Sequence, residues 1–144
     1  MPIVDTEFLF GLNPADRHHN GCRKILEDLS NQLIIPGFAV FEFVLVMLSR
    51  KKNVSEARAA LEALQKITLK YKVREAKIGL EEIIEGLRVL ETYPTKTFFD
   101  GMMVAAALLA DKEIIGNDSS FENVFGLKVQ GIPSINSPDR LMQK

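Results

Sequence analysis

The sequence has one cysteine, Cys22, and almost no net charge. A single thiol excludes an intramolecular disulfide, which agrees with a reducing cytoplasm rather than with a disulfide-stabilised secreted domain. The formal net charge of −1 excludes a basic surface spread over the whole chain. Any contact with nucleic acid would therefore depend on local clusters of Lys and Arg.

A long uninterrupted apolar run is also missing. The longest apolar stretch, "LIIPGFAVFEFVLVML" at 33–48, is broken by Pro36, Gly37 and Glu42. It is shorter than the ~20 residues that a membrane-spanning helix needs. The first residues, "MPIVDTEFLF", lack the basic start of a secretory signal. We therefore predict a soluble, cytoplasmic protein without a membrane partner.

What is present is an alternation of strand and helix patterns within 144 residues, without repeats or linkers. The length and the pattern predict a single domain covering 1–144. Predicted strands lie at 2–5, 32–36, 67–73, 113–117 and 127–132. Predicted helices lie at 16–30, 37–50, 80–91 and 97–111, with another that begins at Ser55 as its N-cap. This order predicts an α/β domain with a mainly parallel five-stranded sheet flanked by helices.

Four acidic residues fall where one edge of such a sheet would gather them. Asp5 ends the first strand and Asp118 follows the fourth. Asp100 lies in the first turn of the helix before the fourth strand, and Glu42 lies roughly 7–8 Å into the helix after the second. Right-handed crossovers place strand ends and helix starts on the same edge. If the first and fourth strands are neighbours, that edge is a ligand-binding switch point.

Three of these acids also have purely structural explanations. Thr97 and Asp100 form a T-x-x-D pattern that is typical of a helix start. Asp118 could cap a short helix, and Asp5 could cap the turn after its strand. Each explanation is sufficient for one residue alone.

Glu42 is harder to explain by structure alone. The apolar residues of 37–50 cover every face of the predicted helix, which indicates burial on more than one side. Glu42 is the only charge between Gly37 and Arg50. Burying an unpaired carboxylate costs several kcal/mol. It therefore needs a compensating cation, which could also be a Lys or Arg from elsewhere in the chain.

A cluster of four carboxylates predicts a bound cation. Without one, mutual repulsion and desolvation would oppose the cluster. The ligands would all be oxygen atoms, which suits Mg²⁺ or Mn²⁺ and not Zn²⁺. Such sites are typical of metal-assisted hydrolysis of phosphodiesters.

Several segments, in their order along the chain, resemble the PIN-domain ribonucleases. They are "IVDT" at 3–6, "LNPADRHHN" at 12–20, "FAVFEF" at 38–43, "FFDGMMVAAALLADKEII" at 98–115, "GNDSSFENV" at 116–124 and "SPDRLM" at 137–142. Within that family the chain is most similar to the VapC-type toxins of toxin–antitoxin pairs. The resemblance extends over essentially the whole chain.

The resemblance implies an endoribonuclease that depends on Mg²⁺ or Mn²⁺, forms a homodimer and is inhibited by a small antitoxin protein. The implied catalytic and metal-binding residues are the four acids, Asp5, Glu42, Asp100 and Asp118. Thr6 matches a small hydroxyl residue of the family, and Asn117 is expected to support the site. Two positions depart from the family pattern: Glu7 replaces an Asn or Ser, and Gly116 replaces a Ser or Thr.

A basic segment could contact the RNA. Arg50, Lys51 and Lys52 follow the Glu42 helix and could bind phosphates. The same charges also suit the end of a helix, whose dipole is negative there. His18 and His19 are expected to have no chemical role. Two alternative functions stay open: a PIN-domain nuclease of RNA processing without an antitoxin, and a non-catalytic PIN-like domain that binds RNA or protein.

Overall fold

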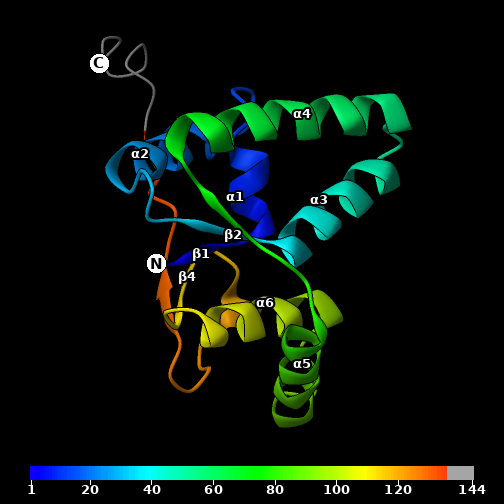
Figure 1. The fold of residues 1–144 in the computed structure, drawn as a ribbon, viewed down its shortest axis with the longest axis vertical. Helices are drawn as coiled ribbons and strands as arrows, with labels where there is room; N and C mark the ends of the chain where they lie inside the picture. Colours follow the sequence, from blue (N-terminus) through cyan, green and yellow to red (C-terminus); the bar gives the residue numbers. More distant parts are fainter. Residues whose placement is uncertain (136–144) are drawn as a thin grey trace.

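The computed structural model describes residues 1–135, in which five short parallel strands form one sheet (Figure 1). The strands are β1 (Ile3–Val4), β2 (Ile34–Pro36), β3 (Arg74–Ala76), β4 (Glu113–Ile115) and β5 (Lys128–Gln130). Their order is β3-β2-β1-β4-β5, so β1 lies between β2 and β4. The predicted α/β class and the parallel sheet are confirmed. The "SPDRLM" segment at 137–142 and the C-terminal end of the predicted domain lie outside the described residues.

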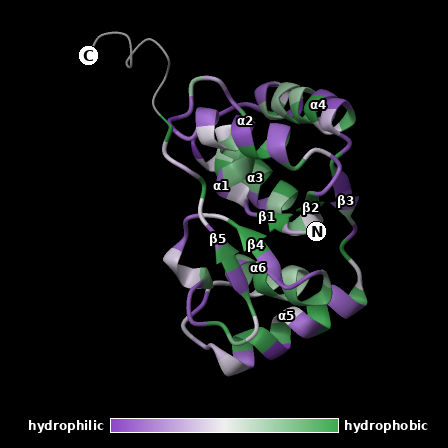
Figure 2. Ribbon diagram, turned by 90° about the vertical axis from the view of Figure 1, so that its left-hand side faces the viewer, coloured by the Kyte–Doolittle hydropathy of each residue, from purple (hydrophilic) through white to green (hydrophobic). Residues whose placement is uncertain are grey.

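Helices cover both faces of the sheet. They are α1 (Thr6–Gly11), α2 (His19–Asp28), α3 (Gly37–Ser49), α4 (Val54–Tyr71), α5 (Leu80–Thr92), α6 (Phe98–Leu109) and the short 3-10 helix η1 (Ser119–Phe121). Helices α1, α2 and α4 lie on one side of the strands, and α5 and α6 lie on the other (Figures 1 and 2). Helix α3 continues directly from β2 and contacts both α1 and α6. It therefore connects the two helical layers.

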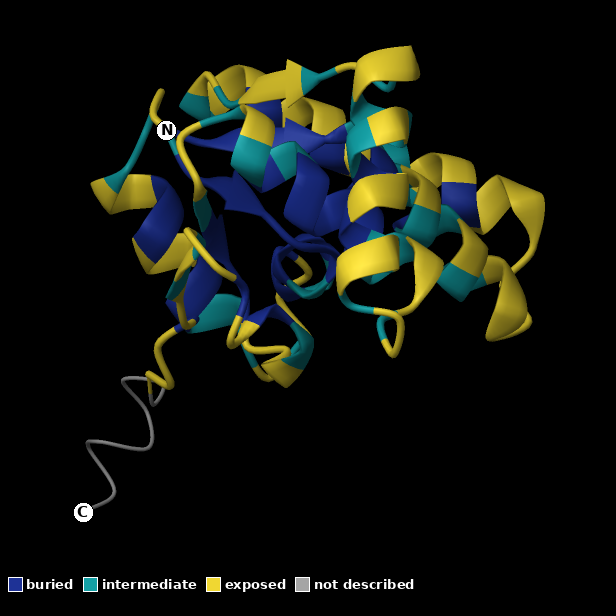
Figure 3. Ribbon diagram, turned by 90° about the horizontal axis from the view of Figure 1, so that it is seen from below, coloured by how far each residue is buried: buried dark blue, intermediate teal, exposed yellow. Residues whose placement is uncertain are grey.

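The centre of the sheet is the most deeply buried part of the chain. Ile3, Val4, Ile114 and Ile115 on β1 and β4 are at most 1% exposed. Figure 3 shows the central strands as buried and the outer surfaces of the helices as exposed, whereas the edge strands β3 and β5 are largely exposed. Because both faces are covered, these strands are continuously apolar instead of alternating. They form a rigid base for the residues that follow them.

The strand predicted at 67–73 is wrong, because α4 continues through Tyr71. The apolar residues Ile67 and Tyr71 are four positions apart and lie half-buried on one face of this helix, whereas Leu69 is 73% exposed. In so short a segment, residues four positions apart fit both the alternation of a strand and one face of a helix, so the pattern does not distinguish the two. The helix ends at Lys72, whose backbone is left-handed, and β3 begins shortly after it.

The N-cap of α4 is Asn53 rather than the predicted Ser55. Asn53 Oδ1 accepts a hydrogen bond from Glu56 N at 2.7 Å, and Glu56 Oε1 accepts one from Asn53 N at 3.4 Å. This reciprocal capping box satisfies two backbone donors, so it defines the start of the helix two residues earlier than expected.

Helix α3 is less buried than its composition predicts. Only Phe38, Ala39 and Phe43 are buried, whereas Phe41 is 61% exposed and Leu45 is 51% exposed. The expectation of burial on several sides is therefore wrong for one face of this helix. Among residues 1–135, no helix is both long enough and apolar enough to cross a membrane.

Candidate active site

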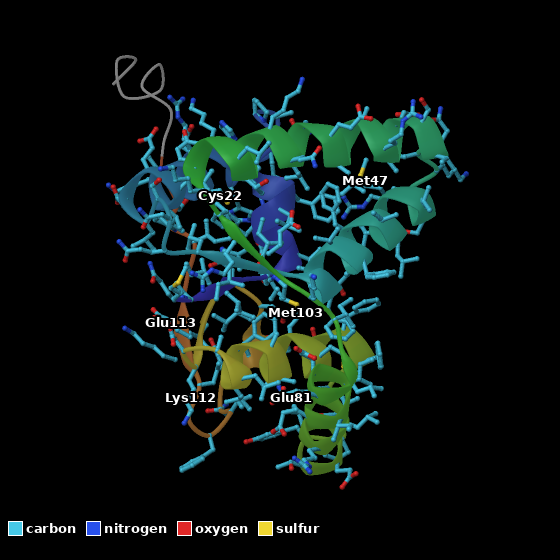
Figure 4. The ribbon with its side chains drawn as sticks, viewed as in Figure 1. Cys22, Met47, Glu81, Met103, Lys112 and Glu113 are labelled. Carbon is cyan, nitrogen blue, oxygen red and sulfur yellow. The ribbon has the colours of Figure 1, made fainter. Side chains whose placement is uncertain are left out.

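The four predicted acids line one pocket of about 400 Å³ at the carboxyl ends of β1 and β4. Asp5 follows β1, Asp118 is the N-cap of η1 after β4, Asp100 lies in the first turn of α6, and Glu42 lies on α3. Met103 of α6, labelled in Figure 4, lines the same pocket. The two strands pair in register, with Val4 opposite Ile115. The first and fourth strands are therefore neighbours, which is the condition under which this edge was predicted to be a ligand-binding switch point.

Asp5 is the buried acid of the pocket, with 4% of its surface exposed. Its N–H donates to Ile115 O at 3.1 Å, and its Oδ1 accepts from Phe8 N at 3.1 Å. Burial raises the pKa of Asp5 from its ordinary 3.8 to about 7. The charges of Glu7, Asp118 and Glu42 raise it further, whereas the hydrogen bond from Phe8 lowers it. The single hydrogen bond from Phe8 N therefore does not offset the cost of holding a negative charge on buried Asp5.

Gly116 gives Asp5 its space. An ideal Cβ at Gly116 would lie 2.5 Å from Asp5 Cγ, which is closer than real Cβ atoms approach other atoms. Its N–H donates to Gln130 O at 2.9 Å, so the backbone is held in place by β5. The departure from the family pattern at this position thus has a physical reason, because the Asp5 carboxylate occupies the space of a side chain.

The capping explanation is correct for Asp5 and Asp118, which also line the pocket. Asp118 Oδ1 accepts from Ser120 N at 2.9 Å. At the start of α6 the cap is Thr97, whose Oγ1 accepts from Asp100 N at 3.2 Å, so this bond does not use the Asp100 carboxylate. Asp5 caps α1 through the bond from Phe8 N. A carboxylate that caps with one oxygen keeps its second oxygen for another ligand. Structural and chemical roles therefore coexist here.

Glu42 does not have the environment that its flanking sequence predicts. It is half-buried, and Asp5 is the deeply buried acid instead. Within the part of the chain that the structure describes, no Lys or Arg forms an ion pair with Glu42. The alternative of a paired structural Glu is thus not supported.

The donor chemistry of the pocket fits a hard divalent cation. All four acids offer oxygen atoms, and Thr6 Oγ1, from a residue lining the same pocket, is buried without a hydrogen-bond partner in the described part of the chain. Among residues 1–135, however, no three His, Cys, Asp or Glu side chains are arranged closely enough to hold a metal. Uncompensated carboxylates repel one another, so a cation would have to draw them together.

A PIN-domain family model matches residues 3–126. The chain belongs to the PIN-domain family. The comparison with curated protein sequences finds no match.

Solved structures of toxin–antitoxin proteins share this PIN fold at low sequence identity. A toxin–antitoxin complex from Klebsiella pneumoniae has a TM-score of 0.67 and 18% identity, over 94% of this chain and 100% of the other. VapC20 of Mycobacterium tuberculosis, a sarcin–ricin loop cleaving toxin, has a TM-score of 0.65 and 18% identity, over 83% and 91%. VapBC2 of Rickettsia felis, bound to a promoter DNA fragment, has a TM-score of 0.69 and 12% identity, over 90% and 96%.

The structure separates the residues that were expected to support the site. Of the three predicted substrate-binding residues, only Arg50 lines the acidic pocket. Lys52 lines another cavity and pairs with Glu56 at 3.7 Å. Asn117 does not line the pocket, and its Oδ1 accepts from Ile132 N at 2.7 Å. This bond ties the loop after β4 to the segment after β5.

Four charged or polar residues of the pocket were missed as site residues. They are Glu7, Asp16, Arg17 and His18. His18 Nε2 lies 2.9 Å from Glu7 Oε1, which connects the segment before α2 to the first turn of α1. The available signal was the departure at Glu7 together with the polar segment at 12–20, which directly follows the first helix of the PIN domain.

The PIN domain has a second and larger cavity, which we call the apolar groove. Its volume is about 710 Å³, and α1, α2, α3 and α4 line it with largely apolar residues. Met47, labelled in Figure 4, lines it in the angle between α3 and α4. Phe10, Asp16 and Arg50 line both cavities, so the groove adjoins the acidic pocket.

Proposed function

We propose that the chain is a metal-dependent endoribonuclease that hydrolyses RNA phosphodiester bonds and acts as the toxin of a toxin–antitoxin pair. One observation supports this most: four carboxylates from four separate elements line one pocket around a buried, undercompensated Asp5. RNA as the substrate also favours a cytoplasmic location.

The proposed roles follow from the surroundings of each acid. Asp5, Glu42, Asp100 and Asp118 would hold Mg²⁺ or Mn²⁺, with Thr6 Oγ1 as a further neutral donor. When bound, the ion polarises the scissile phosphate and lowers the pKa of a water molecule. The hydrogen bond from Phe8 N orients the Asp5 carboxylate, and the absence of a side chain at Gly116 leaves room for it. A pocket carboxylate orients the attacking water and accepts its proton.

The deciding experiment is RNA cleavage by purified protein with Mn²⁺, with a chelator, and by Asp5→Asn. We expect cleavage only with the metal, slowed roughly 100-fold to 1,000-fold by the substitution, because several kcal/mol of charge stabilisation are lost. Asn keeps an acceptor for Phe8 N, so α1 stays capped. Glu81→Gln, on the exposed side of α5, is the matched control (Figure 4). Equal cleavage in every tube would exclude a nuclease.

We further propose that an antitoxin segment binds the apolar groove. Several structural relatives are toxin–antitoxin complexes. The groove is continuous with the acidic pocket through Phe10, Asp16 and Arg50, so a bound segment would reach the site that it must block. A small adjoining gene whose product co-purifies with the chain and suppresses cleavage would support the toxin. Without such a partner, an RNA-processing nuclease would be the better proposal.

A homodimer is the proposed assembly. Helix α3 exposes Phe41, Leu45 and Leu48, and α5 exposes Leu80, Ile84 and Leu87. Spacings of four and three residues place each set on one face of its helix. A second copy would remove this surface from water. Light scattering should give twice the mass of 16.1 kDa, and Leu45→Lys with Ile84→Lys should give the monomer.

A further inference from the structure

Two arginines line the acidic pocket without a carboxylate partner among the described residues. Arg17 and Arg50 line the pocket together with the four acids. Across residues 1–135, neither guanidinium forms an ion pair, although several carboxylates line the same cavity. Cations left unpaired beside an acidic site are available to an anionic ligand.

Arg50 is held in place by an aromatic ring. Its Cζ lies 5.1 Å from the centroid of Phe10. Stacking uses the face of the guanidinium and leaves its N–H edge free, and that edge can bind a phosphate with two parallel hydrogen bonds. Phe10 also packs on Phe43 at a centroid distance of 4.6 Å, so the stacking platform is itself fixed.

His18 and Glu7 hold the chain segment that carries Arg17. His18 Nε2 lies 3.1 Å from Arg17 Nε and 2.9 Å from Glu7 Oε1. One nitrogen cannot accept from Arg17 and donate to Glu7 at the same time. A carboxylate is the stronger acceptor, so we assign Nε2–H to Glu7. With this assignment His18 offers no acceptor to Arg17, so among residues 1–135 the guanidinium keeps its donors for a ligand. Glu7 then holds His18, and with it the segment before α2 that carries Arg17.

We propose that Arg17 and Arg50 bind the phosphates that flank the scissile phosphate of an RNA strand in the acidic pocket. The inference rests on the proposed nuclease function and assigns the contacts that hold its substrate. An acidic pocket repels the strand on either side of the scissile group, and the two guanidiniums offset that repulsion. Glu7 is a positioning residue, because it acts on the strand only by holding His18 and, through the backbone, the adjacent Arg17.

The test measures binding and cleavage separately. Binding of a fluorescent single-stranded RNA is measured in chelator at several salt concentrations, and KM and kcat are measured with Mn²⁺. We expect Arg17→Gln and Arg50→Gln each to reduce the slope of log K against log salt by about 0.7, because one phosphate contact is lost. We expect each to raise KM about tenfold with kcat nearly unchanged. Lys66→Gln, with the same charge change on the exposed surface of α4 outside both cavities, should alter neither.

A pair of Glu7 variants tests the positioning role. Glu7→Ala and Glu7→Gln both remove the charge, but only Gln keeps an acceptor for His18. Weaker RNA binding by the Ala variant than by the Gln variant is expected. Equal binding by the two would overturn the role of Glu7.

The outcomes distinguish this inference from the nuclease proposal. Cleavage by the wild type with unchanged KM and salt slope in both arginine variants would overturn the arginine contacts and leave the nuclease intact. Binding that depends on both arginines, without any cleavage, would support the contacts and overturn the nuclease. A chain that neither binds nor cleaves RNA would overturn both the arginine contacts and the nuclease function. If the arginine variants instead weaken only the binding of the antitoxin, the arginines contact the antitoxin and the proposed RNA contacts are overturned.

Discussion

The acidic pocket and the apolar groove differ in how the fold produces them. The pocket measures about 400 Å³ and collects side chains that follow the central strands. The groove measures about 710 Å³ and is the space that four helices leave between them. Strand ends are fixed by backbone pairing, whereas helices that meet at an angle leave apolar surface open. The smaller cavity is therefore suited to chemistry and the larger one to a partner.

The largest predicted effect tests the charge of the pocket. Because the pKa of folded Asp5 is about 7 and its ordinary value is 3.8, the folded state binds more protons between these values. Stability should therefore fall as pH rises through this window. Relative to Asp5→Asn, the wild-type free energy of unfolding should drop by roughly 3 kcal/mol between pH 5 and pH 8, as measured by denaturation. Added Mn²⁺ should stabilise the wild type more at pH 8 than at pH 5.

A second change alters the shape of the pocket while keeping its charges. Gly116→Ala would force the Asp5 carboxylate away, because the new Cβ would overlap it. Cleavage should fall about 100-fold, since a displacement of about 1 Å is enough for such a loss. In Gly79→Ala the new Cβ meets only the flexible end of Glu82, so this variant should keep its activity. Unchanged kinetics in both variants would show that the position of Asp5 is not critical.

A third change tests whether antitoxin binding at the apolar groove can be lost without loss of RNA cleavage at the acidic pocket. Met47→Lys places a charge in the groove, so affinity for the antitoxin should fall roughly 30-fold, as for a truncated interface anchor. RNA cleavage should stay at the wild-type rate. Leu69→Lys is the matched control, because Leu69 is 73% exposed and lies outside the groove. Titration of the cleavage reaction with antitoxin measures both effects, and a parallel loss of cleavage would contradict the separation of the two cavities.

The sequence was sufficient where a segment fitted only one kind of element. Continuous apolar runs predicted the central strands, and the order of elements predicted the parallel sheet. The prediction was wrong at 67–73, where two periodicities coincide, and at Ser55, where Asn53 offers a better cap. It was also wrong for the burial of α3, because an exposed apolar face has the same composition as a buried one.

By itself, the sequence determined the α/β class and which acids follow which elements, because both depend on local patterns and on the handedness of crossovers. Only the tertiary structure decided that Asp5 is the buried acid, that Gly116 makes room for it, and that Arg17 lies at the same pocket. Burial and close approach depend on neighbours distant in the chain. No local pattern can encode them.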